Sequence, residues 1–143
     1  MILADTSVWI QHFRKGEPDL SVLLADGLVV MHPFVLGELA CGNFTDRSAI
    51  LASLGSLSAV QLATHAEVHY LIKDRKLPGR GLGWLDVHLL AASLVSHCGF
   101  WTLDRRLGQA ARELGLGRMS AQMRQKLEDR DRGAPLDQVY GDG

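Results

Sequence analysis

Four acidic side chains stand at places in the sequence where they could do chemistry together. Asp5 and Asp104 each follow a short apolar run that is typical of a buried strand, whereas Glu38 and Asp86 lie in helical stretches. All four have apolar neighbours, which favours positions at the border of a core over positions on an open face. In an open parallel sheet, ligands bind at the carboxyl ends of the strands, where Asp5 and Asp104 are expected.

A cluster of such acids would need a cation. Two carboxylates about 4 Å apart repel each other by roughly 4 kcal/mol at an effective dielectric constant near 20. The cluster would therefore take up protons or recruit Mg²⁺ or Mn²⁺, which prefer oxygen ligands. A bound ion of this kind can generate a hydroxide nucleophile and neutralise charge on a phosphodiester. We predict that the four carboxylates line one cleft, and leave open whether one or two ions bind there.

The same four acids also allow other interpretations. Acids flanked by apolar residues are commonly helix caps or salt-bridge partners. A phosphoaspartyl phosphatase would carry a second aspartate two residues after Asp5, where Ser7 stands. A non-catalytic binding module that kept the fold is the remaining alternative, although a pure scaffold has no reason to gather unpaired carboxylates.

Short apolar runs alternate with helical stretches along the chain, which is typical of an α/β fold. We expect strands at residues 2–4, 28–31 and 100–103, and a loop at residues 78–83. We expect helices at about residues 7–14, 19–26, 33–41, from 45 onward, 65–76, 85–97 and 105–114. Only a parallel sheet with the first and last of these strands side by side can bring Asp5 and Asp104 to one rim.

The histidines at positions 65 and 69 are four residues apart on an expected helix, a spacing that can hold zinc. The segment Thr64–Glu67 is a capping box, so a solvated helix face is the better interpretation of this pair. His88 is expected at the edge of the core. Trp84 stands in the loop beside Asp86, where it could stack on a nucleic-acid base.

The bulk composition indicates one soluble domain without a membrane span. The 143 residues are 47% hydrophobic and 22% charged, and no uncharged stretch is long enough to cross a bilayer. No targeting segment is visible at the N-terminus, so we expect a cytoplasmic protein. The net charge of −1 gives no general argument for a nucleic-acid partner. A local basic run could hold RNA phosphates, or could be a solvated helix end: Lys73, Arg75, Lys76 and Arg80.

Four segments of the sequence resemble the four motif blocks of PIN-domain ribonucleases, and of the VapC-type toxins in particular, in the order that the family has them. The segments are ILADTSVWI, VLGELACG, GRGLGWLDVHLLAAS and FWTLDRRL. The resemblance covers residues 1–117. It implies a three-layer α/β/α fold with a four- to five-stranded parallel sheet, dependence on Mg²⁺ or Mn²⁺, and endonucleolytic cleavage of RNA.

The resemblance also implies residue roles and partners. By position, the family's four catalytic, metal-holding acids match Asp5, Glu38, Asp86 and Asp104, and its supporting hydroxyls match Ser7, less surely Thr6, and Thr102. The family implies a homodimer and a cognate VapB-like antitoxin that blocks the active site. Residues 118–143 depart from the family pattern. They are expected to form a mobile tail or a short helix with Met119, Met123 and Leu127 on one face.

Overall fold

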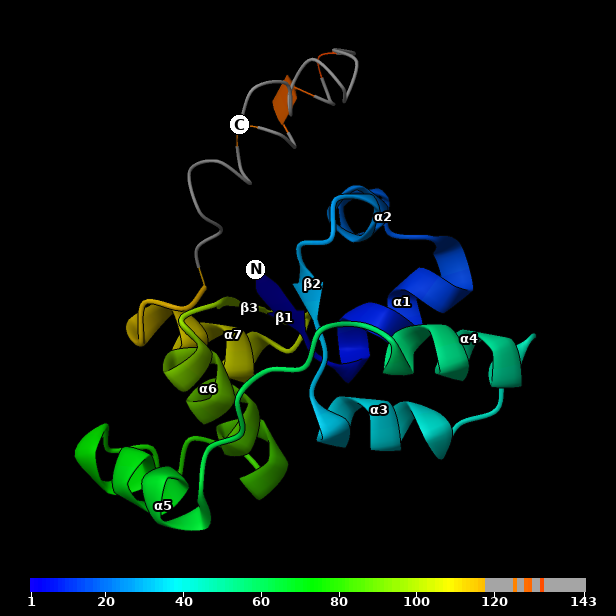
Figure 1. Cartoon of the computed structure of the whole chain (residues 1–143). Helices are drawn as coiled ribbons and strands as arrows, with labels where there is room; N and C mark the ends of the chain where they lie inside the picture. Colours follow the sequence, from blue (N-terminus) through cyan, green and yellow to red (C-terminus); the bar gives the residue numbers. More distant parts are fainter. Residues whose placement is uncertain (118–124, 126–127, 130–131, 133–143) are drawn as a thin grey trace.

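The computed structural model of the protein describes residues 1–117, 125, 128–129 and 132 (Figure 1). Within this part, three strands and seven helices follow the predicted order, which confirms the α/β class. The strands are β1 (Ile2–Ala4), β2 (Val29–Val30) and β3 (Gly99–Trp101). The helices are α1 (Thr6–Lys15), α2 (Pro18–Ala25), α3 (Pro33–Ala40), α4 (Arg47–Gly55), α5 (His65–Asp74), α6 (Trp84–Ser96) and α7 (Arg105–Glu113).

The sheet is parallel, with the strand order β2-β1-β3. Leu3 in the central strand pairs with Val30 on one side and Phe100 on the other. The described residues thus contain three strands, fewer than the four to five that we predicted. A further extended segment meets the sheet only at one bridge, between Met31 and Ala59.

Pro33 ends the extended segment that contains β2 and the bridge at Met31. Proline has no N–H to donate and is favoured in the first turn of a helix. It begins α3 two residues after the bridge at Met31, so the chain leaves the sheet there. The segment beside it keeps two hydrogen bonds, from Met31 N to Ser58 O (2.9 Å) and from Val60 N to Met31 O (3.0 Å).

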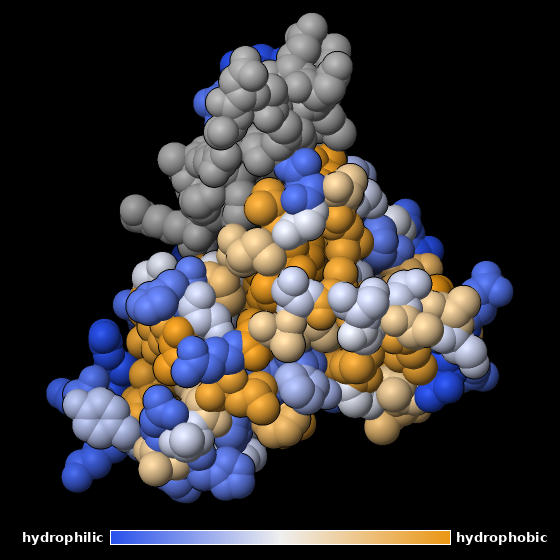
Figure 2. Space-filling model, viewed as in Figure 1, coloured by the Kyte–Doolittle hydropathy of each residue, from blue (hydrophilic) through white to orange (hydrophobic). Residues whose placement is uncertain are grey.

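The strands run through the middle of the molecule, and helices lie on both sides of them. In Figure 1, α6 and α7 lie on one side of the strands, and α1, α3 and α4 on the other. All three residues of β1 are buried, together with apolar side chains from several helices: Val8, Trp9, Leu20, Val35, Leu90 and Leu107. In Figure 2, apolar side chains gather in the middle of the face shown, and hydrophilic ones lie at its outer corners.

Helices α1, α5 and α7 each begin directly after a residue whose side chain caps the helix. Asp5 and Asp104 are the N-cap residues of α1 and α7, and each accepts a hydrogen bond from the backbone of its first turn. The capping box at Thr64 is present in both halves, which confirms the predicted start of α5. Two of the four candidate acids therefore lie at junctions between a strand and a helix.

The predicted apolar stripe of Met119, Met123 and Leu127 lies outside the described residues. Within the part of the chain that is described, none of the helices combines the length and the apolar character that crossing a bilayer requires.

Candidate active site

Asp5 lies where the ends of two neighbouring strands meet. It directly follows β1, and its backbone N–H donates to the carbonyl oxygen of Trp101, the last residue of β3, at 2.9 Å. Its side chain is 7% exposed. The parallel pairing of β1 with β3 thus places a buried carboxylate at the sheet edge where the chain continues from Thr102 to Asp104.

Two hydroxyl groups hold the Asp5 carboxylate from opposite sides. Ser7 Oγ donates to Oδ1 and Thr102 Oγ1 donates to Oδ2, each at 2.5 Å. Both hydroxyls also accept a backbone hydrogen bond: Ser7 Oγ from Leu103 N and Thr102 Oγ1 from Asp104 N, each at 3.0 Å. Because each hydroxyl oxygen accepts from the backbone, its proton is directed to Asp5.

Burial raises the pKa of Asp5 above its ordinary value of 3.8, although the hydrogen bonds from Ser7, Thr102 and Val8 oppose this shift. Among the described residues, neither Asp5 nor Asp86 forms an ion pair with an arginine or lysine. The carboxylate of Asp5 thus has donors that favour its charged form but no cationic side chain among the described residues to neutralise it. This is the electrostatic situation that a bound cation would relieve.

Asp104 and Asp86 each use one oxygen to hold the start of a helix. Asp104 Oδ1 accepts from Leu107 N at 2.9 Å, and its side chain is exposed. Asp86, which is half-buried in the first turn of α6, accepts at Oδ2 from Gly83 N, also at 2.9 Å. Within the described part of the chain, the second oxygen of each carboxylate makes no hydrogen bond, so one oxygen of each is open to a ligand.

Glu38 lies on the exposed face of α3 and lines a depression of about 260 Å³ with Ile10 and Phe13 of α1. Asp5 and Asp86 are therefore both more buried than Glu38, as expected from the apolar residues that flank them. No three histidine, cysteine or acidic side chains within the described ranges lie close enough together to hold a metal ion. The structure connects Asp5 to Asp104 through Thr102, and the meeting of all four acids on one cation stays a prediction.

The three predicted supporting hydroxyls occupy different environments. Ser7 and Thr102 contact the Asp5 carboxylate directly. Thr6 Oγ1 is buried without a hydrogen-bond partner among the residues described. The hydroxyl at position 6 therefore does not orient any of the candidate acids.

The predicted basic run is divided between two surfaces. Lys73 and Lys76 lie exposed at the end of α5, and the neighbouring Arg75 pairs with Asp74 at 3.3 Å. Arg80 lies apart from these residues, and its Nη1 pairs with Oε2 of Glu113 in α7 at 2.5 Å. It shares an open depression of about 530 Å³, which we call the arginine groove, with residues of α7: Arg105, Arg106, Gln109 and Arg112.

The residues predicted to contact RNA did not include the arginines of α7. A usable signal was present, since positions 105, 109 and 112 are spaced to share one face of a helix. The partnership with Arg80 across 33 positions of the chain carries no such signal.

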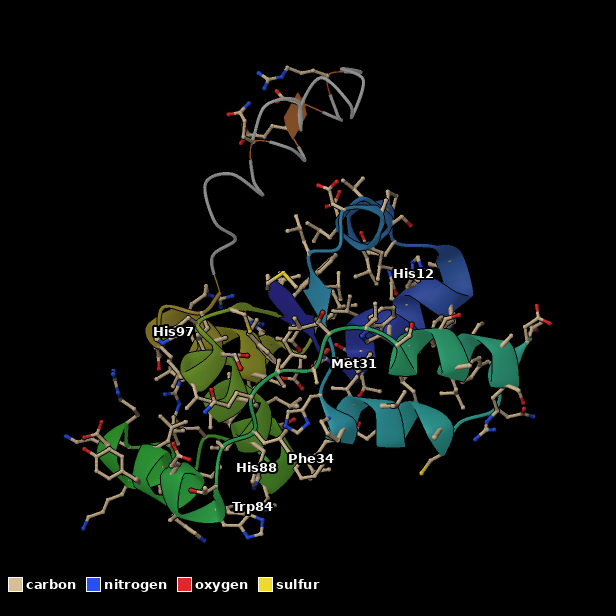
Figure 3. The ribbon with its side chains drawn as sticks, in the orientation of Figure 1. His12, Met31, Phe34, Trp84, His88 and His97 are labelled. Atoms are coloured by element: carbon tan, nitrogen blue, oxygen red, sulfur yellow. The ribbon has the colours of Figure 1, made fainter. Side chains whose placement is uncertain are left out.

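Rings from three helices and the cap of α3 form the histidine–aromatic cluster, in which His32 and His88 are buried. Phe34, Trp84 and His88 of this cluster are labelled in Figure 3. Trp84 contacts His88 at 4.6 Å, His69 at 4.9 Å and His65 at 5.6 Å between ring centroids. Phe34 contacts His88 at 5.2 Å and His32 at 4.8 Å. The zinc interpretation of His65 and His69 gains no support here, since no third histidine, cysteine or acidic side chain of the described residues completes a metal site with them.

The buried histidines of this cluster favour the neutral form. Burial, with a smaller contribution from the charge of His88, lowers the pKa of His32 from 6.5 to about 4. Burial also lowers the pKa of His88, helped by the charges of His65 and His69. His32 Nδ1 accepts from Phe34 N at 2.9 Å, whereas Nε2 of His88 is buried without a partner within the described part of the chain.

The geometry can be set beside known proteins. No protein-family model matches the chain. Ribonuclease VapC32 of Mycobacterium tuberculosis strain ATCC 25618 / H37Rv is 44% identical over 117 residues, which cover 81% of this chain and 94% of the relative. The protein of the same description from strain CDC 1551 / Oshkosh matches to the same extent. With the edge of the sheet carrying the buried aspartate, and with this identity over most of both proteins, the chain belongs to the VapC family of PIN-type ribonuclease toxins.

Proposed function

We propose that the chain is a toxic endoribonuclease that hydrolyses RNA phosphodiester bonds with Mg²⁺ or Mn²⁺, on a three-layer PIN-type domain formed by residues 1–117. The observation that carries this proposal is the carboxylate of Asp5, which is buried, oriented by two hydroxyls and not paired with a cationic side chain within the described residues. The similarity to proteins named ribonucleases supports the same activity.

The proposed metal ligands are Asp5, Glu38, Asp86 and Asp104. Their donor atoms are all carboxylate oxygens, which fits a hard divalent ion. When bound, such an ion would activate a water molecule and neutralise charge at the phosphate. Ser7 and Thr102 would keep the Asp5 carboxylate in one orientation, because each donates to a different oxygen. Thr6 makes none of these contacts and is not included in the proposed site.

The proposed partners are an RNA substrate and a VapB-like antitoxin that blocks the acidic site, with the toxin a homodimer in the cytoplasm. Lys73, Arg75, Lys76 and Arg80 are proposed RNA contacts. Residues 118–143 would be a short helix or tail appended to the nuclease domain.

Metal-dependent cleavage is tested on purified protein with a structured RNA. We expect products with Mg²⁺ or Mn²⁺ and none when EDTA removes the ion. Equal cleavage with and without EDTA would contradict the proposal. The antitoxin is tested by expressing the chain with and without the small partner encoded beside it. Growth arrest that the partner relieves is the expected result, and unimpaired growth without the partner contradicts toxicity.

A further inference from the structure

The arginine groove is formed by two segments that each adjoin a candidate acid. Arg105 and Arg106 follow Asp104 at the start of α7, and Arg112 lies near the end of the same helix. Arg80 enters from the loop that leads to Asp86 at the start of α6. The groove is therefore lined by one segment that directly follows Asp104 in the chain and by another that leads to Asp86.

The positive charge in this groove is mostly unbalanced. Glu113 pairs with Arg80, and Arg112 donates to the neutral side chain of Gln109 at 2.9 Å. Arg105 and Arg106 are exposed and make no ion pair within the described ranges of the chain. Four arginines and one glutamate leave three formal positive charges on the groove, although the whole chain carries a net charge of −1.

The loop beside the groove is shaped to leave room for one of these arginines. Gly81 has a φ of +77°, a conformation that side chains disfavour. A Cβ atom at this position would overlap the guanidinium group and Cδ of Arg106, whose side chain would then have to move. The absence of a side chain at position 81 thus lets Arg106 lie against the loop.

We propose that the arginine groove is the principal binding site for the phosphate backbone of the RNA, and that it delivers the strand to the edge of the sheet at Asp5 and Asp104. This inference rests on the proposed ribonuclease function. Arginine presents a planar fork of donors that matches two phosphate oxygens, and it remains charged at any working pH. Contacts to backbone phosphates are expected to be largely independent of the RNA sequence.

An acidic segment of a protein partner could use the same charges. We favour RNA because the groove is open and lined by charged and polar side chains, and because Arg105 directly follows the proposed catalytic Asp104 in the chain. Its lining contains no aromatic or aliphatic anchor of the kind on which protein interfaces depend.

The test is the salt dependence of RNA binding, measured by fluorescence anisotropy with a labelled single-stranded RNA in EDTA so that no cleavage occurs. Each lost phosphate contact should reduce the slope of log affinity against log salt by about 0.7. Arg105→Ala and Arg106→Ala should each weaken binding several-fold and reduce the slope by this amount. The double variant should show about twice the reduction.

Two variants separate a charge effect from a binding site. Lys15→Ala removes one exposed positive charge at the end of α1, so it matches each single arginine variant in net charge. It should leave the slope unchanged. Arg106→Lys keeps the charge but loses the fork, and should retain most of the slope while weakening binding.

Glu113→Gln gives an effect of opposite sign, which a folding defect cannot imitate. It removes the carboxylate that neutralises Arg80 and should strengthen RNA binding and steepen the slope. Melting temperatures of all variants serve as the folding check. Unchanged affinity in Glu113→Gln and in the double arginine variant would overturn the inference.

Two further outcomes are decisive. A loss of the slope in a Lys73, Arg75 and Lys76 triple alanine variant, with the groove variants unaffected, would place the phosphate contacts on α5 instead. Binding of a poly-glutamate peptide that the groove variants lose, while RNA affinity is unchanged, would assign the groove to a protein partner. The cleavage assay with Mg²⁺ is separate, so RNA binding without any cleavage refutes the proposed function but not the groove.

Discussion

Two regions of this protein contain buried ionisable groups, and these groups differ in their hydrogen bonding. At the sheet edge, the Asp5 carboxylate receives hydrogen bonds from Ser7, Thr102 and the backbone. In the histidine–aromatic cluster, the buried His88 is surrounded by rings, and its Nε2 has no partner in the described part of the chain. Burial favours the neutral form in both regions, raising the pKa of Asp5 and lowering those of His32 and His88.

The hydrogen bonds distinguish the two environments. Donors directed at both oxygens of a carboxylate stabilise its charged form, so the hydrogen bonds at Asp5 oppose the effect of burial on its pKa. His88 is packed against rings, and its Nε2 has no hydrogen-bond partner among the described residues. The two sites therefore differ in polar support: hydrogen bonds hold the Asp5 carboxylate, whereas the His88 ring is held by packing.

Asp5→Asn should have the largest effect, because it removes the charge but keeps the shape. We expect cleavage of RNA to fall by at least about a hundredfold, the scale of losing one preorganised electrostatic group. Stability should be equal or higher, since burial of the charge is relieved. Cleavage rates with Mg²⁺ and thermal melting check this pair of effects. A variant that cuts RNA at the full rate would remove Asp5 from the site.

The histidine–aromatic cluster should make the protein lose stability as the pH falls from about 6.5 towards about 4. The folded pKa of His32 lies below its unfolded value, so the unfolded chain binds the proton first. At about pH 5 the free energy of unfolding should be lower by on the order of 2 kcal/mol from this group. His88 acts in the same direction. Urea titrations at several pH values measure the loss.

A matched variant tests that assignment. Asparagine is a favoured N-cap and can accept from Phe34 N as His32 Nδ1 does. His32→Asn should therefore keep α3 capped while removing part of the pH dependence. Asp5 opposes the trend, because a carboxyl group whose folded pKa is raised gains stability as the pH falls through that pKa. The same loss of stability in His32→Asn as in the natural chain would show that other groups cause it.

Thr102→Val and Thr6→Val make the same change at two threonines, of which Thr102 donates to Asp5 and Thr6 does not. Thr102→Val removes a donor to Asp5 and an acceptor for Asp104 N, and should cost about 1–3 kcal/mol and raise the pKa of Asp5 further. Thr6→Val removes a buried hydroxyl that has no described partner and should change stability by less than about 0.5 kcal/mol, or increase it. Urea denaturation of both variants measures the difference. Equal costs would contradict the hydrogen-bond assignment.

His88→Leu should have only a small effect, although the residue is buried. It replaces a ring whose Nε2 has no partner among the described residues with an apolar side chain of similar volume, so we expect a change within about 1.5 kcal/mol and a weaker pH dependence. Equilibrium unfolding at neutral and acidic pH measures both quantities. A much larger loss in the free energy of unfolding would show that His88 makes a stabilising polar interaction.

The sequence by itself determined features that depend on a few neighbouring residues. The capping box at Thr64, the proline at the start of α3 and the strand–helix junction after Asp5 could be identified from residue type and spacing. The apolar neighbours of Asp5 also predicted its burial. These features follow from local hydrogen bonding and hydrophobic periodicity, which act within one or two turns of chain.

Only the tertiary structure decided which distant groups meet. Thr102 donates to a carboxylate 97 positions away because β3 pairs in parallel with β1. Arg80 lies apart from the basic residues that precede it in the chain: it pairs with Glu113 and shares a groove with the arginines of α7. The sheet has three strands in the described chain, and the segment around Ala59 meets it only through the bridge to Met31. Such contacts depend on how whole elements pack, and the residues that neighbour a group in the sequence do not identify its distant partner.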